Sequence, residues 1–192
     1  MNNLNKVSLL RVQLINGESG ICNCQGIYCW WFKKDSAKII LSKLDLNESE
    51  IDRIQKREIE GEEYWALYFG ISNDMLGRAK WHILQKHSKS AVKYGTLSTL
   101  RQSLSALLDI DMSFSEEDVN MFMDNNCYWE WEYTDNAKEE EKNELHSDDK
   151  CYPLNIQENH TVEKDIIKNL KCIRGSPAKP CVYLSKKFSQ SE

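Results

Sequence analysis

The sequence predicts a single α/β (α+β) domain in which a small, mostly antiparallel, three-stranded sheet is flanked by helices. Short aromatic and apolar segments suit buried strands, and the apolar residues between them follow helical spacing. A hydrophobic content of 41% over 192 residues is enough for one core. No apolar run reaches the ~18 residues of a membrane span, and the first 20 residues lack the apolar part of a signal peptide. We therefore expect a cytoplasmic protein that does not contact a membrane.

Strand signals occur at four places along the chain. Residues 26–32 and 64–72 are rich in bulky aromatic and apolar side chains, and residues 127–133 alternate aromatic with other residues. This composition favours strands with at least one buried face. Residues 7–15 alternate loosely and are rich in β-forming side chains, so they are a candidate first strand.

Helix signals follow the second clear strand. Residues 75–87 and 96–108 place apolar side chains three and four positions apart, which is the spacing of one helix face. Ser115 precedes three acidic residues, a pattern typical of a helix start, and this helix is expected to run through Met123. Residues 162–170 are the candidate last helix.

We expect one domain over residues 1–192, with a core over residues 24–160. The mostly polar residues 33–63 are interpreted as an insertion that holds a helical turn or two. Residues 135–149 are so charged that a solvated helix or a flexible segment fits them best. Residues 175–192 are expected to form a loose tail.

The net charge of −5 weighs weakly against nucleic-acid binding, since proteins that bind polyanions usually carry a basic surplus. Acidic residues, however, concentrate in residues 48–63 and 135–149, whereas residues 78–101 contain no Asp or Glu. An acidic average can therefore hide one positive face. The residues predicted to contact DNA on that face are Lys86, Lys89, Lys93 and Arg101.

Seven cysteines raise the question of disulfides or zinc. The number is odd and no secretion signal is present, so free thiols are expected. Cys22, Cys24 and Cys29 form a tight group, but no second pair follows at a spacing typical of zinc sites. Structural zinc is therefore disfavoured.

Two short motifs lie on the predicted strands and a third on the helix after them. Gly26-Ile27-Tyr28 and Tyr68-Phe69-Gly70 precede a helix that carries Arg78 and His82. With these residues the chain resembles the GIY-YIG nuclease superfamily over about residues 24–160. It is most similar to the branch that includes some restriction endonucleases. The segments that carry this narrower resemblance are Gly95, Ser98-Thr99-Leu100-Arg101 and Pro153-Leu154-Asn155.

The spacing of these residues allows one shared site. Arg78 and His82 are four residues apart, so they lie one turn apart on one helix face. In strand 64–72 the two-residue period sends Tyr68 to one face and both Leu67 and Phe69 to the other. Tyr28 likewise lies opposite its two neighbours in sequence, so both tyrosines are expected on the same side of the sheet.

The resemblance implies a GIY-YIG endonuclease-like fold and hydrolysis of phosphodiester bonds in DNA. It implies that Tyr28 is the general base or positions the attacking water. Arg78 would clamp the scissile phosphate, because a guanidinium can bond two of its oxygens. Tyr68 and His82 would orient the phosphate or relay protons, and Asn155 would either bond to the phosphate site or close a turn.

The resemblance also implies one divalent ion, Mg²⁺ or Mn²⁺, held by a single glutamate. The chain departs from the family pattern here, because a polar segment offers several glutamates before Asn155. We prefer Glu144 as the metal ligand, with Glu141 as second choice. The other candidates in this segment are Glu139 and Glu140.

A different class of function competes with catalysis. The fold could serve as a DNA-binding or regulatory module that has lost its activity, which the uncertain glutamate favours. The complete set of Tyr28, Tyr68, Arg78 and His82 favours the enzyme, although each of the four taken singly is compatible with ordinary packing or a solvated charge. The expected partner is DNA, and a palindromic target would call for a homodimer of matching symmetry.

Overall fold

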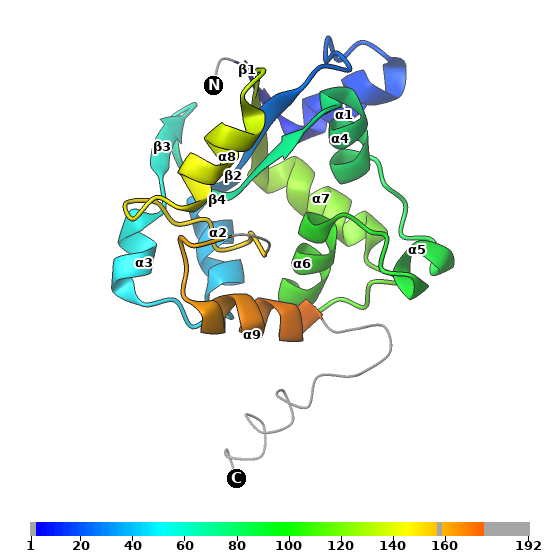
Figure 1. Cartoon of the computed structure of the whole chain (residues 1–192). Coiled ribbons are helices and arrows are strands. Elements are labelled where there is room, and N and C mark those ends of the chain that lie inside the picture. Colours follow the sequence, from blue (N-terminus) through cyan, green and yellow to red (C-terminus); the bar gives the residue numbers. More distant parts are fainter. Residues whose placement is uncertain (1–2, 157–158, 175–192) are drawn as a thin grey trace.

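A computed structural model of the chain describes residues 3–156 and 159–174, which form a five-stranded antiparallel sheet with helices on both faces (Figure 1). The strands are ordered β1-β5-β2-β4-β3 across the sheet. Their bounds are β1 Asn3–Lys6, β2 Gly26–Lys33, β3 Lys56–Ile59, β4 Glu62–Ser72 and β5 Cys127–Tyr133. The three expected strands are the central ones, β5, β2 and β4. The expectation of three strands was wrong because it missed both edges.

Both edge strands are short and mostly polar, so they carry no apolar alternation. β1 pairs with β5, and β3 forms a hairpin with β4. The hairpin turns at Glu60 and Gly61, whose φ angles of 53° and 81° match the two left-handed positions of a tight hairpin turn. Such strands are formed by pairing with a neighbour rather than by their own sequence pattern.

The prediction of a strand at residues 7–15 was wrong. This segment is helix α1 (Val7–Asn16), and it ends at Gly17 in the left-handed conformation typical of a helix C-terminus. Its buried residues follow helical spacing, but apolar residues also occupy its exposed side, so the sequence shows no clear period. The buried ones are Val7, Leu10 and Leu14; the exposed ones are Leu9, Val12 and Ile15.

Residues 33–63 are more ordered than an inserted loop. They contain α2 (Lys34–Leu41), α3 (Glu48–Arg53) and β3. Ile40, Leu44 and Ile54 are fully or almost fully buried, so this segment is part of the core.

The remaining helices are α4 (Met75–Ile83), α5 (Lys89–Lys93), α6 (Thr99–Leu107), α7 (Glu116–Asn126), α8 (Ala137–Leu145) and α9 (Lys164–Arg174). They are close to their predicted places, except α5, for which no helix was predicted. α4 is shorter than predicted. The charged segment after β5 forms α8, and the predicted tail at residues 175–192 lies outside the described residues. No helix within the described part of the chain is long and apolar enough to cross a membrane.

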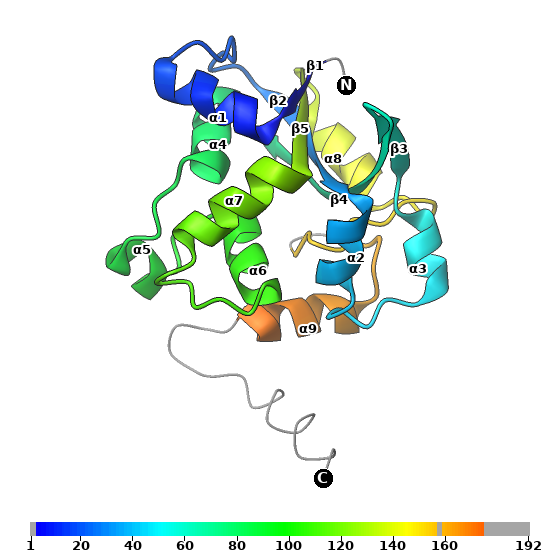
Figure 2. The ribbon, with the colours of Figure 1, turned by 180° about the vertical axis from the view of Figure 1, so that it is seen from behind.

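The sheet separates two hydrophobic clusters of unequal size. Figures 1 and 2 show α8 on one face and α1, α2 and α7 on the other. The side chains of β2 alternate between the clusters, as strand geometry requires. Tyr28, Trp30 and Phe32 belong to the larger cluster, on the side of α1, α2 and α7. Ile27, Cys29 and Trp31 belong to the smaller one, beneath α8.

A β-bulge interrupts the alternation of β4. Trp30 pairs with Tyr68 and Trp31 pairs with Ala66, so Leu67 is an extra residue in the strand. Leu67 and Tyr68 consequently both pack on the larger cluster, while Phe69 belongs to the smaller one. The expectation that Leu67 shares a face with Phe69 was therefore wrong. The expectation that Tyr28 and Tyr68 share a face is confirmed.

The cysteines also differ in part from expectation. Cys22 and Cys24 form a disulfide in the loop before β2, with their Cα atoms 5.3 Å apart. The expectation of free thiols was wrong for this pair, because their shared loop brings the two Cα atoms within disulfide range. Cys29, Cys127 and Cys151 are free and buried.

Candidate active site

Tyr28 in β2 and His82 in the last turn of α4 are in direct contact. Tyr28 Oη lies 2.9 Å from His82 Nε2, and the two ring centroids are 5.4 Å apart. The exposed fractions are 1% for Tyr28 and 0% for His82. His82 is thus buried together with Ala79 and Ile83 rather than on a face opposite to them.

Tyr68 and Arg78 surround this pair. The ring of Tyr68 stacks on that of Tyr28 at 6.1 Å and meets that of His82 edge-on at 5.9 Å. Arg78 lies one turn before His82, partly exposed, with its guanidinium over the ring of Trp81 at 4.7 Å. The structure therefore brings together the four residues that the sequence motifs singled out.

Burial favours the neutral form of both members of the central pair. It raises the pKa of Tyr28 well above its ordinary 10, and a hydrogen bond with Tyr68 and the charge of Glu141 add to the rise, while Arg78 opposes it. Burial also lowers the pKa of His82 well below its ordinary 6.5, and the charge of Arg78 adds to that effect. Loss of the Tyr28 proton therefore requires additional positive charge at the site.

A second layer of side chains holds His82 from behind. His82 Nδ1 lies 3.1 Å from the hydroxyl of Ser98, the N-cap residue of α6. Arg101 in the first turns of α6 donates to the His82 carbonyl at 3.0 Å and to His87 Nε2 at 2.9 Å. Ser98 and Arg101 lie in the segment that carried the narrower resemblance, but no pattern in that segment indicates these contacts.

The burial of Arg101 corrects one expectation about DNA contact. Arg101 is 0% exposed, so it cannot meet a phosphate backbone and instead binds groups inside the fold. Its sequence neighbourhood is basic, and a basic pattern does not distinguish a surface charge from a buried, fully bonded one. Lys86, Lys89 and Lys93 are exposed, as a DNA contact requires.

Asn155 binds the backbone of β4. Its Oδ1 accepts from Phe69 N at 2.9 Å, and its Nδ2 donates to Phe69 O at 2.6 Å. Leu154 N also donates to Leu67 O, so this segment pairs along β4. Asn155 thereby fixes the strand next to Tyr68, and its amide is engaged by the protein rather than aimed at the tyrosines.

The charges of Glu144 and Glu141 act on different groups of the protein. Glu144 pairs with Lys150 at 2.5 Å and accepts from Tyr152 Oη at 2.6 Å. It lines a cleft with Ile27, Cys29 and Phe69, on the face of the sheet away from Tyr28. Burial is the main cause of the raised pKa values of Tyr28 and Tyr68, and the negative charge of Glu141 adds to the rise in both.

No group of three or more His, Cys, Asp or Glu able to hold a metal ion occurs within residues 3–156 and 159–174. A metal at the tyrosine side would therefore take one carboxylate from the protein and oxygen atoms from substrate and water. Mg²⁺ accepts such a ligand set. Of the two glutamates considered, Glu141 is the one whose charge acts on both tyrosines, whereas Glu144 is bound by Lys150 and Tyr152.

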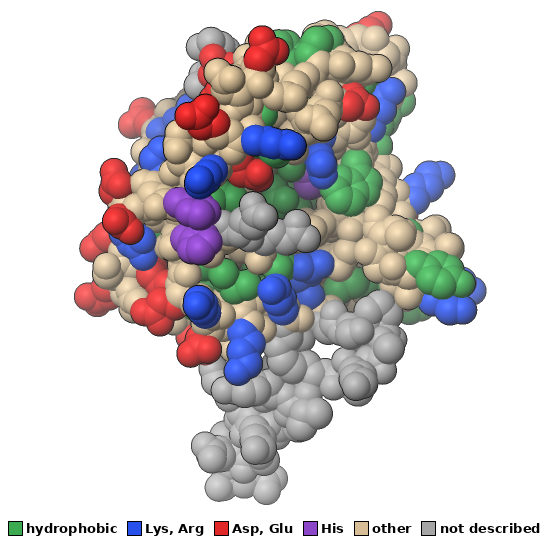
Figure 3. Space-filling model, viewed as in Figure 1, with side chains coloured by type: hydrophobic (Ala, Val, Ile, Leu, Met, Phe, Trp, Pro, Cys, Tyr) green, Lys and Arg blue, Asp and Glu red, His purple; other side chains and the backbone are tan. Residues whose placement is uncertain are grey.

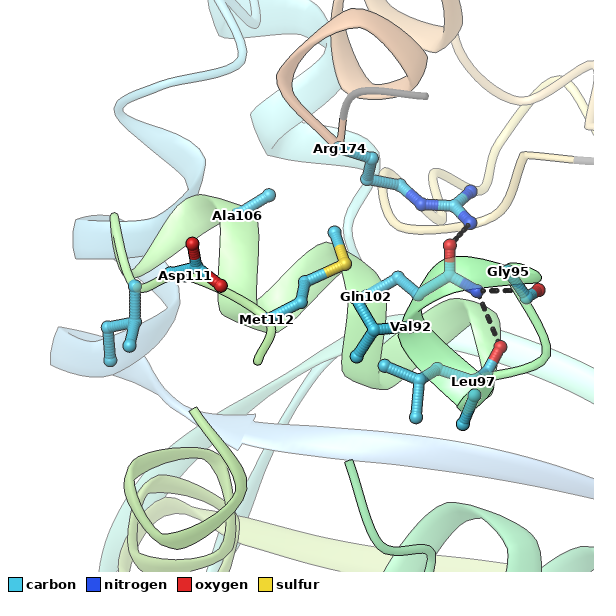
Figure 4. Close-up of a pocket in the computed structure, with 10 residues that line it drawn as sticks. Val92, Gly95, Leu97, Gln102, Ala106, Asp111, Met112 and Arg174 are labelled. Atoms are coloured by element: carbon cyan, nitrogen blue, oxygen red, sulfur yellow. Dashed lines mark hydrogen bonds between the residues drawn. The ribbon is translucent and has the colours of Figure 1, made fainter. Parts of the chain in front are cut away.

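Arg174 is a residue near the site that sequence reasoning missed. It ends α9, beyond the predicted helix limit of residue 170, and donates to Gln102 Oε1 at 2.6 Å (Figure 4). Gln102 in turn donates to the carbonyl oxygens of Gly95 and Leu97. Burial is the main influence on the pKa of Tyr68 and raises it. The positive charge of Arg174 is a smaller influence that lowers it. A positive charge from the far end of the chain is thus brought toward the tyrosine pair.

Comparison with known proteins gave one finding. A family model of the GIY-YIG catalytic domain matches residues 26–176, which is well over half of the chain. Neither the curated proteins nor the solved structures gave a match. The matched region begins at Gly26 and contains Tyr28, Tyr68, Arg78 and His82. The contact between Tyr28 and His82 therefore lies inside a recognised nuclease domain, and the chain belongs to the GIY-YIG nuclease superfamily.

Proposed function

We propose that this protein is a divalent-metal-dependent DNA endonuclease. The observation that carries the proposal is the Tyr28–His82 contact at 2.9 Å with Arg78 one helical turn away. Phosphodiester hydrolysis needs an oriented nucleophile, a base for its proton and positive charge at the phosphate. These three requirements match a phenol, a guanidinium and a supporting imidazole in one place.

In this mechanism Tyr28 takes the proton of the attacking water or holds that water in line with the phosphorus. Arg78, which is partly exposed, binds the non-bridging oxygens and neutralises the charge that grows on them. The ring of Tyr68 stacks on that of Tyr28 at 6.1 Å and helps to hold it in place. A bound Mg²⁺ or Mn²⁺ would supply further positive charge at the phosphate.

We propose Glu141, rather than the first-choice Glu144, as the carboxylate that holds the metal. The charge of Glu141 raises the pKa of both tyrosines. The charge of Glu144 instead raises the pKa of Cys29, on the opposite face of the sheet, where burial and the charge of Glu130 are the larger causes. A metal at Glu141 would also offset the negative charge that Glu141 places near Tyr28.

DNA would be held by basic side chains around the site. Figure 3 shows Lys and Arg side chains across the middle of one face, with Asp and Glu mostly toward its left edge and its top. Lys86, Lys89 and Lys93, all exposed, extend the positive charge along the segment after α4. A restriction-type enzyme that cuts a palindromic site would act as a homodimer.

The full burial of Tyr28 favours one rival, a DNA-binding module without catalysis. Incubating supercoiled plasmid with the protein and Mg²⁺, Mn²⁺ or a chelator separates the two. We expect nicked and linear products with either metal, none with chelator, and none from Tyr28→Phe. Tight binding without products under every metal condition would support the module instead.

A further inference from the structure

A chain of two hydrogen bonds runs through His82 inside the protein. Its Nε2 meets Tyr28 Oη at 2.9 Å, and its Nδ1 meets Ser98 Oγ at 3.1 Å. The exposed fractions of Ser98, His82 and Tyr28 are 0%, 0% and 1%, so water does not replace either partner. A neutral imidazole has one N–H, and the nitrogen that carries it sets the direction of both bonds.

The other contacts of Ser98 decide that direction. As the N-cap of α6, its Oγ accepts the backbone N–H of Arg101 at 3.2 Å. Its own hydroxyl hydrogen needs an acceptor, and within the hydrogen bonds of the described residues that acceptor is His82 Nδ1. If Nδ1 carried the proton instead, the Ser98 hydroxyl hydrogen would be buried without an acceptor. An unpaired buried polar group is disfavoured strongly enough to select one tautomer.

We infer that Ser98 fixes His82 as the Nε2–H tautomer, so that His82 donates a hydrogen bond to Tyr28 Oη. The Tyr28 hydroxyl hydrogen then points away from His82, toward the neighbouring phenol of Tyr68, whose ring stacks on that of Tyr28 at 6.1 Å. When Tyr28 releases its proton to water at the active site, the phenolate oxygen keeps a donor already in place and needs no reorientation of the imidazole.

The assignment gives His82 a defined part in the reaction. It stabilises the Tyr28 phenolate as a hydrogen-bond donor and does not take the Tyr28 proton, because its ring nitrogen toward Tyr28 is already protonated. Ser98 is a positioning residue that acts through His82. This catalytic consequence rests on the proposed nuclease function, whereas the tautomer itself does not.

The tautomer can be observed directly in the whole protein. Long-range ¹H–¹⁵N spectra of protein labelled at histidine separate protonated from unprotonated ring nitrogens, and His82→Gln identifies the His82 signals among those of the four histidines. We expect a protonated Nε2 and an unprotonated Nδ1 in wild type, and in Ser98→Thr, which keeps the hydroxyl. Ser98→Ala should give a mixture of tautomers. A protonated Nδ1 in wild type would overturn the inference, as would a Ser98→Ala spectrum identical to wild type.

Cleavage kinetics test the consequence. Second-layer partners that orient an imidazole are typically worth about 10- to 100-fold, so Ser98→Ala should lower kcat by that factor and leave KM nearly unchanged. Ser42→Ala removes an exposed serine hydroxyl that bonds to the Ile39 carbonyl and contacts no histidine, and it should cut like wild type. Wild-type kcat in Ser98→Ala would contradict the positioning role. If wild type cut no DNA with any metal, the proposed function would fail, and the spectra alone would still decide the tautomer.

Discussion

Gly70 makes room for the phenol of Tyr28. The two residues face each other in the β2–β4 register, and a Cβ atom on Gly70 would lie 2.6 Å from Tyr28 Oη and 2.7 Å from its Cζ. Gly26 has a similar role, since its Cβ would lie 2.3 Å from the Glu132 carbonyl oxygen of β5. The glycine of the second motif thus permits the position of the tyrosine in the first, which explains why the two occur together.

Gly70→Ala should therefore damage cleavage by displacing Tyr28. A shift of about 1 Å in a reacting group can cost on the order of 10²-fold in rate, and we expect a loss of that size in kcat on plasmid DNA. Ile71→Ala changes the next residue of β4, which packs on the smaller cluster, and should stay within a few-fold of wild type. Equal activity of Gly70→Ala and wild type would contradict the proposed role of Tyr28.

Arg78→Ala should abolish cleavage and leave the fold intact. Arg78 contacts the Trp81 ring at the surface, so its loss should cost about 1 kcal/mol or less of unfolding free energy. Loss of an arginine that stabilises a phosphoryl transition state typically costs about 10³-fold or more. The matched control is Lys80→Ala, an exposed basic residue on the same helix, which should cut at nearly the wild-type rate. Urea unfolding of both variants separates a catalytic loss from a folding defect.

Glu141→Gln should bind DNA at least as well as wild type but should not cut it. The substitution removes the carboxylate for the metal and also a negative charge near the phosphate. Glu139→Gln, at an exposed position of α8, should cut normally. Glu144→Gln should weaken the contacts with Lys150 and Tyr152 and so lower stability more than activity.

Gel-shift and cleavage assays of these three α8 variants, with the thermal midpoint of each, provide the comparison. Loss of cutting in Glu144→Gln alone, at unchanged stability, would restore Glu144 as the metal ligand. Full cutting by all three would remove α8 from the metal site.

Replacing both Lys89 and Lys93 by alanine should weaken DNA binding and flatten its salt dependence. Each phosphate contact contributes about 0.9 to the slope of log affinity against log salt, so the slope should fall by about 1.8. Both side chains are exposed, and little change in stability is expected. Arg101→Ala is the contrasting variant: it leaves buried hydrogen-bond acceptors without their donor and should lower the unfolding free energy by about 2 kcal/mol or more. An unchanged salt slope in the double variant would place the DNA surface elsewhere.

Stability should decrease below neutral pH because of His82. Burial, followed by the charges of Arg78 and Arg101, holds its pKa well below 6.5 in the folded chain. As pH falls below about 6.5 the unfolded chain takes up a proton that the folded chain does not, so folding loses up to about 1.4 kcal/mol per pH unit. The full contribution is present above that pH. Urea unfolding at several pH values should show this slope, and His82→Gln should reduce it; an equal slope in both proteins would contradict the buried neutral imidazole.

Local sequence patterns are enough to predict the centre of the fold and the residues that meet there. β2, β4 and β5 are aromatic or apolar segments, and α4 and α6 have regular apolar spacing, so their patterns lie within single segments. The four-residue step from Arg78 to His82 fixes their place on one helix turn in any tertiary context. Strand alternation and helix periodicity are local properties, and both can be read without knowing which segments touch.

Tertiary structure decided what depends on distant partners. α1 is apolar on both sides, so the contacts of Val7 and Leu10 in the core, rather than a visible period, reveal it as a helix. From sequence alone, Arg101 is interpreted as a surface charge. The folded structure shows it buried, with hydrogen bonds to His87 and to the His82 carbonyl. Glu141 and Glu144 are three residues apart on α8, and the groups on which each charge acts depend on how that helix packs. Burial and charge pairing are sums over neighbours from the whole chain, and a linear pattern does not contain those neighbours.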